Sequence, residues 1–284
     1  MKICKTIDDM RAASRSARRA GKRLGFVPTM GALHEGHLSL VRAAKAKCNV
    51  VAVSIFVNPL QFGPSEDLAK YPRTFGRDAE LLEKEAVDIL FVPASEEMYP
   101  AGAVTYVTVE ALSEKLCGKS RPGHFRGVTT VVAKLFHIVE PDMAFFGQKD
   151  AAQTTIIRRM VRDLNLPVEI VVCPIVREPD GLAMSSRNAY LSPQERKSAL
   201  VLHRSLTEVK SRFDQGERVA IKLIAVGEQV LAQEPAVRLD YFEIVDPSTL
   251  DPTQELTSGA LVAIAAFVGN TRLIDNILLP KPRS

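Results

Sequence analysis

Between residue 24 and about residue 174, short apolar runs alternate with longer amphipathic stretches. Apolar runs bounded by Gly, Pro or Asn indicate buried strands at 25–28, 50–57, 89–92, 143–146 and 168–173. The stretches at 38–47, 75–86, 128–139 and 151–164 have helical periodicity. This alternation predicts an α/β fold with a parallel sheet and helices on both of its faces. In such sheets ligands bind beyond the carboxyl ends of the strands, so functional residues are expected in the loops that follow strands.

The pattern changes after about residue 176. Ser192 precedes a long helical stretch that has Pro193 in its first turn and Glu195 three residues after Ser192, which is a strong helix-start signal. A second helix is expected at 219–232, followed by apolar strands at 237–245 and 260–268. We therefore expect two domains, residues 1–175 with the parallel sheet and residues 176–284 as a smaller α+β domain.

Charge and composition limit the class of protein. The 284 residues are 46% hydrophobic and 25% charged, as in ordinary globular proteins, and the net charge is +4. Residues 1–24 carry +6 and the remainder −2, so most of the chain is not a basic nucleic-acid surface. The longest apolar run, 260–268, is far shorter than the roughly 20 residues that cross a bilayer.

The basic amino terminus and the cysteines bear on where the protein works. An Arg-rich targeting segment is one interpretation of the amino terminus, but residues 6–9 resemble a capping box and favour a solvated first helix. Four cysteines form neither a CxxC pair nor a metal-ligand spacing. They are typical of reduced thiols in a cytoplasmic protein.

A histidine pair follows the first predicted strand. His34 and His37 are three residues apart at an expected helix start, so they share one helix face near backbone N–H groups that favour anions. This arrangement suits a polyphosphate. A surface histidine pair and half of a metal site are the alternatives, although neither HExxH nor an obvious third ligand is present.

A second phosphate motif can be set aside. Gly118, Lys119 and Ser120 suggest a P-loop, but the glycine required five residues before Gly118 is Ser113. No strand leads directly into this segment. Neither GxGxxG nor GxSxG occurs in the chain.

Three further segments offer chemistry. Asn58 and Gln61 follow the second predicted strand and present neutral amides beside apolar groups, as a small hydroxylated acid requires. After the fourth strand, Lys149 is suited to a phosphate and Asp150 to a magnesium ion, although a turn with a helix cap is the alternative. The 184–187 segment, with two hydroxyls and Arg187, is suited to a triphosphate.

Five segments together carry a family resemblance. PTMGALHEGH, FVNPLQF, YPRT, FFGQKD and LAMSSRN, in this order and at these spacings, resemble the pantothenate synthetase family of AMP-forming ligases. The HxGH motif alone would indicate only the wider nucleotidyltransferase superfamily. The resemblance extends over essentially the whole chain and implies a Rossmann-like doubly wound amino-terminal domain, a carboxyl-terminal lid and a homodimer.

The resemblance also implies the reaction and its residues. Pantoate would be adenylated by Mg-ATP, and the β-alanine amine would then displace AMP. His37 would be the proton donor with His34 as its partner, Lys149 would join them in catalysis, Gln61 would touch pantoate and β-alanine, and Gln153 would bind pantoate. ATP would be bound by Met30, Gly31, Ala32, Leu33, His34, Glu35, Gly36, His37, Gly147, Gln148, Lys149, Asp150, Val176, Met184, Ser185, Ser186 and Arg187.

One departure and two alternatives remain at this point. The family commonly has glutamine where this chain has Ala152, so support of Gln153 by a neighbouring amide is in doubt. A nucleotidyl transferase acting on a phosphorylated acceptor is an alternative, but residues 58–66 contain no Lys or Arg to bind such an acceptor. A nucleic-acid-binding protein that uses the basic amino terminus is the other. We expect no partner beyond substrates and a second copy, and no membrane.

Overall fold

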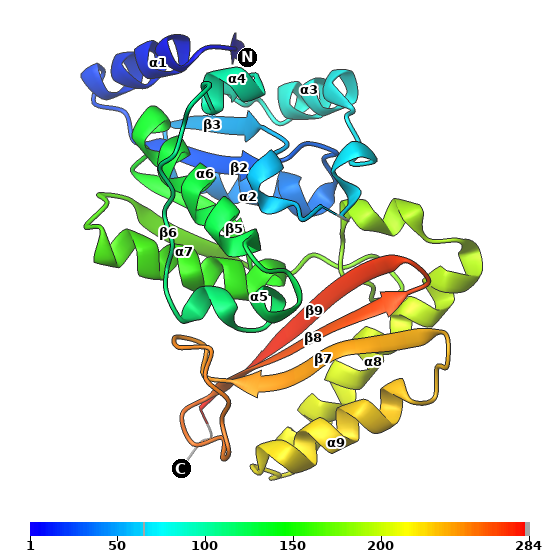
Figure 1. Cartoon of the computed structure of the whole chain (residues 1–284). Coiled ribbons are helices and arrows are strands. Elements are labelled where there is room, and N and C mark those ends of the chain that lie inside the picture. The colour runs from blue at the N-terminus through cyan, green and yellow to red at the C-terminus, as the bar shows by residue number, and fades with distance from the viewer. Residues whose placement is uncertain (65, 282–284) are drawn as a thin grey trace. The chain divides into compact units, whose positions relative to one another are not determined.

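The computed structural model describes residues 1–64 and 66–281 and divides the chain into two compact units (Figure 1). Unit 1 comprises residues 1–113, 121–148 and 156–174. Unit 2 comprises residues 114–120, 149–155 and 175–284. The two short segments, 114–120 and 149–155, therefore belong to unit 2 although unit 1 surrounds them in the sequence. Domains at 1–175 and 176–284 stay a prediction.

Unit 1 contains a parallel sheet with strand order β1-β4-β3-β2-β5-β6. The predicted α/β fold is confirmed. The strands are β1 (Lys2–Cys4), β2 (Leu24–Thr29), β3 (Val50–Ile55), β4 (Ile89–Phe91), β5 (Met143–Gly147) and β6 (Glu169–Cys173). Strand order reverses at β2, which lies between β3 and β5, so the carboxyl ends of β2 and β5 flank a topological switch point where ligands bind in such sheets.

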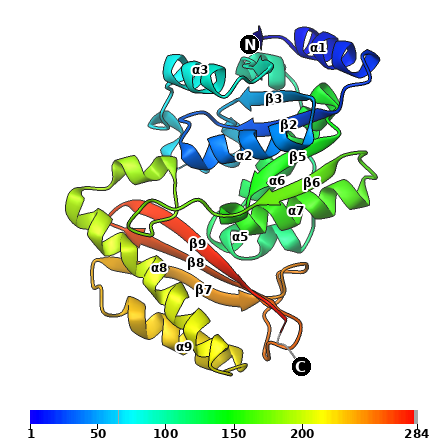
Figure 2. The ribbon, with the colours of Figure 1, turned by 180° about the vertical axis from the view of Figure 1, so that it is seen from behind.

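Helices cover both faces of this sheet (Figures 1 and 2). Leu38 and Val41 of α2 and Leu82 of α3 share an apolar core with β2, β3, β4 and β5. On the opposite face, α1 and α6 contact each other and β2. The helices that connect the strands are α1 (Ile7–Arg19), α2 (Glu35–Lys47), α3 (Phe75–Lys84), α4 (Ser95–Met98), α6 (His124–Val139) and α7 (Ala151–Asp163), with short 3₁₀ helices η1 (Pro59–Gln61), η2 (Asp67–Ala69), η3 (Leu112–Glu114) and η4 (Gln148–Asp150).

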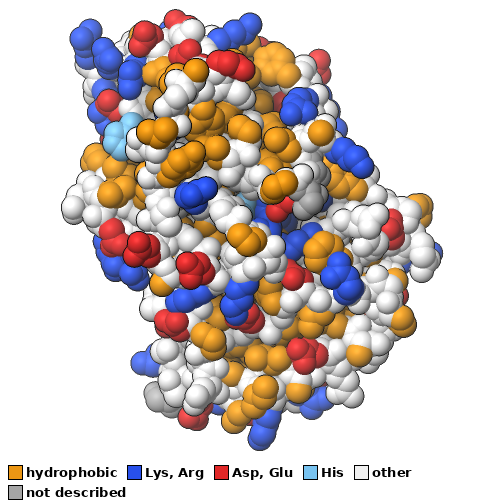
Figure 3. All heavy atoms as spheres, in the orientation of Figure 1, with side chains coloured by type: hydrophobic (Ala, Val, Ile, Leu, Met, Phe, Trp, Pro, Cys, Tyr) orange, Lys and Arg blue, Asp and Glu red, His pale blue; other side chains and the backbone are white. Residues whose placement is uncertain are grey.

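The basic amino terminus forms the predicted solvated helix. Thr6 caps α1 by accepting a hydrogen bond from the Asp9 amide at 3.1 Å. Met10, Ala13 and Ala17 face the interior. None of the four arginines of α1 is buried, and Figure 3 shows Lys and Arg side chains gathered at the end of the molecule where α1 lies in Figure 1.

Unit 2 is built on an antiparallel sheet with order β7-β8-β9, formed by β7 (Val237–Val245), β8 (Ala260–Val268) and β9 (Thr271–Leu279). The helices α8 (Pro193–Asp214) and α9 (Ala220–Leu231) cover one face and enclose an apolar core with it. Ser192 and Glu195 form the predicted capping box of α8. Short helices α5 (Cys117–Ser120) and η5 (Ser186–Tyr190) complete the unit.

The second face of this sheet is covered by the segments 114–120 and 149–155. Lys119 forms an ion pair with Glu243 at 2.8 Å, and Cys117 Sγ lies 3.2 Å from the Tyr241 hydroxyl. The Thr155 hydroxyl donates to the carbonyl of Pro247. Polar contacts on this face therefore tie two distant parts of the sequence to unit 2.

Candidate active site

The loop after β2 is shaped by a buried aspartate of α3. Gly31 and Ala32 have positive φ angles of 83° and 51°, so the chain turns sharply here. Asp78, which is 1% exposed, accepts hydrogen bonds from the amides of Ala32 and Leu33, both at 2.9 Å. Thr74 donates its hydroxyl to the same carboxylate. A single side chain from α3 thus holds the 30–34 backbone in place.

His34 and His37 lie side by side at the start of α2. His34 is the N-cap residue, and its Nδ1 accepts from the Gly36 amide at 3.1 Å, while His37 Nδ1 accepts from the His34 amide. The ring centroids are 4.1 Å apart. A ring nitrogen that accepts a hydrogen bond carries no proton, so this arrangement places the proton of each neutral imidazole on Nε2. Both Nε2–H groups are then donors suited to phosphate oxygens.

Several backbone amides of this loop have protein acceptors. Besides the two amides that donate to Asp78, the Gly31 amide donates to the Thr29 hydroxyl and the Gly36 amide to His34. A share of this loop's backbone in anion binding stays a prediction.

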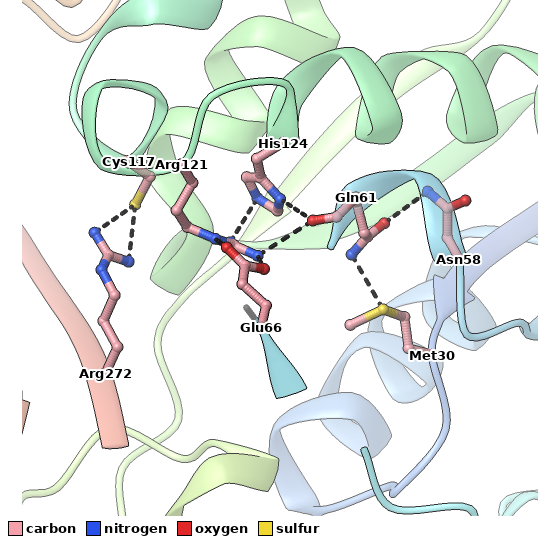
Figure 4. A network of polar contacts seen from close by, with 8 residues as sticks. All are labelled: Met30, Asn58, Gln61, Glu66, Cys117, Arg121, His124 and Arg272. Carbon is pink, nitrogen blue, oxygen red and sulfur yellow. Dashed lines mark hydrogen bonds and ion pairs between the residues drawn. The ribbon is translucent and has the colours of Figure 1, made fainter. Parts of the chain in front are cut away.

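Gln61 is held from both its side chain and its backbone (Figure 4). Its Oε1 accepts from Asn58 Nδ2 at 3.0 Å, and its Nε2 donates to Met30 Sδ at 3.1 Å. Its carbonyl contacts His124 Nδ1 at 2.8 Å and accepts from Arg121 at 3.3 Å. The η1 turn of Gln61 is therefore fixed by residues of the loop that precedes α2 and of the start of α6.

Asn58 is buried and hydrogen-bonded to several protein groups. It is 1% exposed, and its Nδ2 also donates to the Gly127 carbonyl at 3.1 Å. Its Oδ1 accepts from the Tyr99 hydroxyl at 2.8 Å, and burial raises the pKa of that phenol so that it stays protonated. Asn58 therefore orients Gln61, and substrate binding by Asn58 stays a prediction.

Arg121, His124 and Glu66 were not predicted as site residues. Arg121 pairs with Glu66 at 2.6 Å and contacts His124 Nε2 at 2.9 Å. Burial opposes ionisation of Glu66, but the hydrogen bond and charge of Arg121 outweigh it, and the pKa of Glu66 is lowered. In the sequence, residues 121–124 resemble an ordinary turn before a helix, and no local pattern marks Arg121 or His124 as site residues.

In unit 2, the hairpin before 184–187 brings Val176 and Met184 together. The Met184 amide donates to the Val176 carbonyl at 3.0 Å, and Arg177 and Ala183 form an antiparallel bridge. Ser185 then caps η5 by accepting from the Arg187 amide. The hairpin therefore presents the predicted nucleotide-binding residues of this segment as one group.

Lys149 and Asp150 form the turn that precedes α7. Lys149 Nζ lies 3.8 Å from Asp150 Oδ1. Gly147 and Gln148 belong to unit 1, whereas Lys149, Asp150 and Gln153 belong to unit 2. Ala152 is buried, so the position commonly occupied by glutamine is here part of the packed side of α7.

No residue set of the described chain, 1–64 and 66–281, gathers three or more His, Cys, Asp or Glu side chains placed to hold a metal ion. The histidine pair follows the carboxyl end of β2, at the switch point of the sheet. A doubly wound α/β sheet with two imidazoles at its switch point is typical of enzymes that bind nucleotides.

The family model for pantoate-beta-alanine ligase matches residues 2–278, and the chain belongs to this family. Pantothenate synthetase of Koribacter versatilis is 60% identical over 279 residues, which cover 98% of this chain and 96% of that protein. The enzyme of Thermotoga neapolitana is 58% identical over 98% of this chain and 100% of its own length.

Solved structures agree with this assignment. Pantothenate synthetase from Thermus thermophilus has a TM-score of 0.93 and 48% identity and covers 98% of this chain and 99% of its own. Pantoate-beta-alanine ligase from Francisella tularensis, complexed with beta-gamma ATP and beta-alanine, has a TM-score of 0.82 and 34% identity over 98% and 97% of the two chains. The family resemblance expected from the five sequence segments is confirmed, and the protein is a ligase that joins pantoate to β-alanine.

Proposed function

We propose that this ligase acts in two steps, through a pantoyl-adenylate. In the first, a pantoate carboxylate oxygen bonds to the α-phosphorus of ATP while the bond from that phosphorus to the bridging oxygen breaks and releases pyrophosphate. In the second, the β-alanine amine attacks the acyl carbon, loses a proton and displaces AMP. The family match over residues 2–278 carries this proposal.

The carboxylate must be activated because its charge makes it a poor acyl electrophile. In the first step negative charge develops on the departing pyrophosphate, and fixed donors aimed at that charge lower the barrier. His34 and His37 can supply Nε2–H donors, and Lys149 and Arg187 can supply positive charge. We assign ATP binding to residues 30–37, 147–150, Val176 and 184–187 on this basis.

Gln61 is the proposed contact for both pantoate and β-alanine. An amide donates and accepts at once, which suits a hydroxy acid on one side and an amine on the other. Because Asn58, Met30 and the carbonyl contacts of Arg121 and His124 fix its position, Gln61 can orient the reacting groups without reordering. Gln153 is proposed to bind pantoate.

Asp150 is the proposed protein ligand of magnesium. Mg²⁺ at ATP sites takes one or two carboxylates together with phosphate oxygens and water, and the partly exposed carboxylate of Asp150 fits that requirement. When bound, the ion would neutralise phosphate charge. Lys149, 3.8 Å from Asp150, would keep its own ammonium beside the same phosphates.

Pyrophosphate exchange tests the two-step reaction. The enzyme with pantoate, ATP and magnesium should incorporate labelled pyrophosphate into ATP without β-alanine, and His37→Ala should lose most of this exchange. Exchange that requires β-alanine would contradict the stepwise reaction. A transferase acting on a phosphorylated acceptor, or a nucleic-acid-binding protein, would show no pantoate-dependent exchange.

We also propose that the protein is a cytoplasmic homodimer. The resemblance implies the dimer, and all four cysteines are thiols, as is usual in reducing compartments. In the described part of the chain no helix is long and apolar enough to cross a membrane. Light scattering should give twice the chain mass of 31.2 kDa, and a monomer mass at micromolar concentration would overturn the dimer.

A further inference from the structure

We propose that Asp275 and Asn276, neighbours on β9, are positioning residues for the two phosphate-binding segments of unit 2. Asn276 holds the backbone of Lys149, and Asp275 holds the hairpin that leads to residues 184–187. The inference rests on the proposed function, since it takes Lys149 and Arg187 as groups that bind ATP.

The two residues are buried on opposite faces of the sheet. Asp275 is 4% exposed and Asn276 is 3% exposed, although Asp and Asn are rarely buried so completely. Side chains alternate between faces along a strand. Asp275 pairs in register with Ile264, whose face carries the apolar core with α8 and α9. Asn276 pairs with Ala263, which lies opposite Glu243 on the face covered by 114–120 and 149–155.

Asn276 fixes the Lys149 backbone. Its Nδ2 donates to the Lys149 carbonyl at 2.9 Å, a contact across 127 positions of sequence. Lys149 lies in the short η4 turn (Gln148–Asp150). The buried side-chain amide of Asn276, near the middle of β9, therefore fixes the backbone position from which the Lys149 side chain extends.

Asp275 fixes the hairpin on the other face. Its two carboxylate oxygens accept from Arg177 at 2.7 and 3.0 Å, a bidentate pair with a defined orientation. Arg177 also donates to the Gly181 carbonyl at 3.1 Å, which closes the hairpin. Met184 directly follows this hairpin, and its amide donates a hydrogen bond to the Val176 carbonyl. The direction of residues 184–187 therefore depends on the Asp275–Arg177 ion pair.

The hairpin has further supports that make it a rigid arm. Arg196 of α8 pairs with Glu178 and Asp180, each at 2.7 Å. The ring of His203 packs against Gly181, where an added Cβ would come within 2.6 Å of the ring, and the φ of Gly181 is +95°. Because these contacts hold the hairpin together, a shift of Arg177 should also shift the segment that follows the hairpin. Asp275, which binds Arg177, therefore influences the backbone position of Arg187.

A hydrogen bond within the dipeptide links the two anchors. Asp275 Oδ1 also accepts from the Asn276 backbone amide at 2.8 Å. Two adjacent residues of β9 therefore hold both the Lys149 backbone and the hairpin that begins at Arg177. Misplacing a phosphate-binding group by about 1 Å is enough to slow a reaction by up to roughly a hundredfold.

A double-mutant cycle tests whether Asn276 positions Lys149. The variants are Asn276→Ala, Lys149→Ala and the two combined, assayed by pantoate-dependent pyrophosphate exchange at saturating ATP. Asn276→Ala should lower kcat about tenfold or more with an unchanged KM for pantoate. In the Lys149→Ala background it should change kcat by less than about twofold, because the group that it positions is gone.

A substitution of Arg177 tests whether Asp275 positions the segment that contains Arg187. Arg177→Lys keeps the charge but loses the bidentate geometry, so the buried Asp275 keeps a cation and the chain should fold. We expect a fall in kcat of about tenfold, which should disappear in the Arg187→Ala background. Asp275→Asn is the companion variant and should behave in the same way if it folds.

Ser198→Ala is the matched control for a lost buried hydrogen bond in unit 2. Ser198 is buried, and its hydroxyl donates to Glu234 at 3.1 Å and to neither Lys149 nor Arg177. It should lower Tm as much as Asn276→Ala and leave kcat unchanged. Effects of Asn276→Ala and Lys149→Ala that multiply, or a control that slows the enzyme equally, would overturn the positioning role. If Lys149→Ala alone keeps the full rate, the proposed ATP contact fails first and this inference fails with it.

Discussion

Two carboxylates hold the backbone around the proposed substrate contacts of unit 1. Asp78 bonds two amides of the loop that begins at Met30, and Glu66 pairs with Arg121, which in turn donates to the Gln61 carbonyl. Asp78 acts on its turn directly, whereas Glu66 acts through Arg121.

Replacing Asp78 should loosen the loop after β2. Asp78→Asn keeps the shape but turns an amide NH₂ toward an amide N–H, so we expect a loss of about 1–3 kcal/mol of unfolding free energy. The KM for ATP should rise severalfold. Urea unfolding and initial rates measure the two effects. Thr74→Val, which removes only the hydroxyl that donates to Asp78, should have a smaller effect on both; equal effects would show that the amide contacts matter little.

The Glu66–Arg121 pair should make stability depend on acid pH. The folded-state pKa of Glu66 is lowered from its ordinary 4.5, so its contribution is present above that value and is lost as the pH falls through the folded pKa. Glu66→Gln should therefore cost about 1 kcal/mol near neutral pH. The difference from the unchanged protein should shrink below pH 4.5 in urea unfolding series. A difference that does not vary with pH would contradict the ion-pair account.

At the scale of elements, the close packing of η1 on α6 determines where Gln61 lies. Gly127 allows it: an added Cβ would lie 2.2 Å from the Leu60 carbonyl oxygen. The periodicity predicted α6 from residue 128, but it begins at His124 because Gly123 caps it with a φ of +81°. The missed first turn is the part of α6 that contacts the site.

Gly127→Ala should displace η1. We expect a loss of about 1–3 kcal/mol of unfolding free energy, as for other overpacked positions, and a severalfold higher KM for pantoate because Gln61 moves with η1. Gly76→Ala is the control, because Gly76 is also helical and an added Cβ there has no neighbour within 4 Å. An unchanged KM in Gly127→Ala would show that Gln61 does not depend on this contact.

At the scale of the whole molecule, alternating periodicity was enough to predict the parallel sheet and the change of architecture after residue 176. It could not predict β1, which has three residues, or β9, whose apolar run is interrupted by Asp275 and Asn276. It also could not place 114–120 and 149–155 in unit 2, since contacts such as Cys117 with Tyr241 span 124 residues.

The candidate site shows the same limit. The motif residues were recognisable because the loops after strands are where such chemistry occurs. Asp78 and His124 were not, because they act through main-chain hydrogen bonds to partners 45 to 63 positions away. No local pattern reports such contacts.

The fate of a carboxylate oxygen tests the adenylate most directly. Pantoate labelled with ¹⁸O in its carboxylate is converted with ATP and unlabelled β-alanine, and the nucleotide product is analysed by mass spectrometry. If pantoate attacks the α-phosphorus, AMP carries one ¹⁸O atom, because the acyl–oxygen bond breaks in the second step. Label in inorganic phosphate with release of ADP, or AMP without label, would contradict the pantoyl-adenylate.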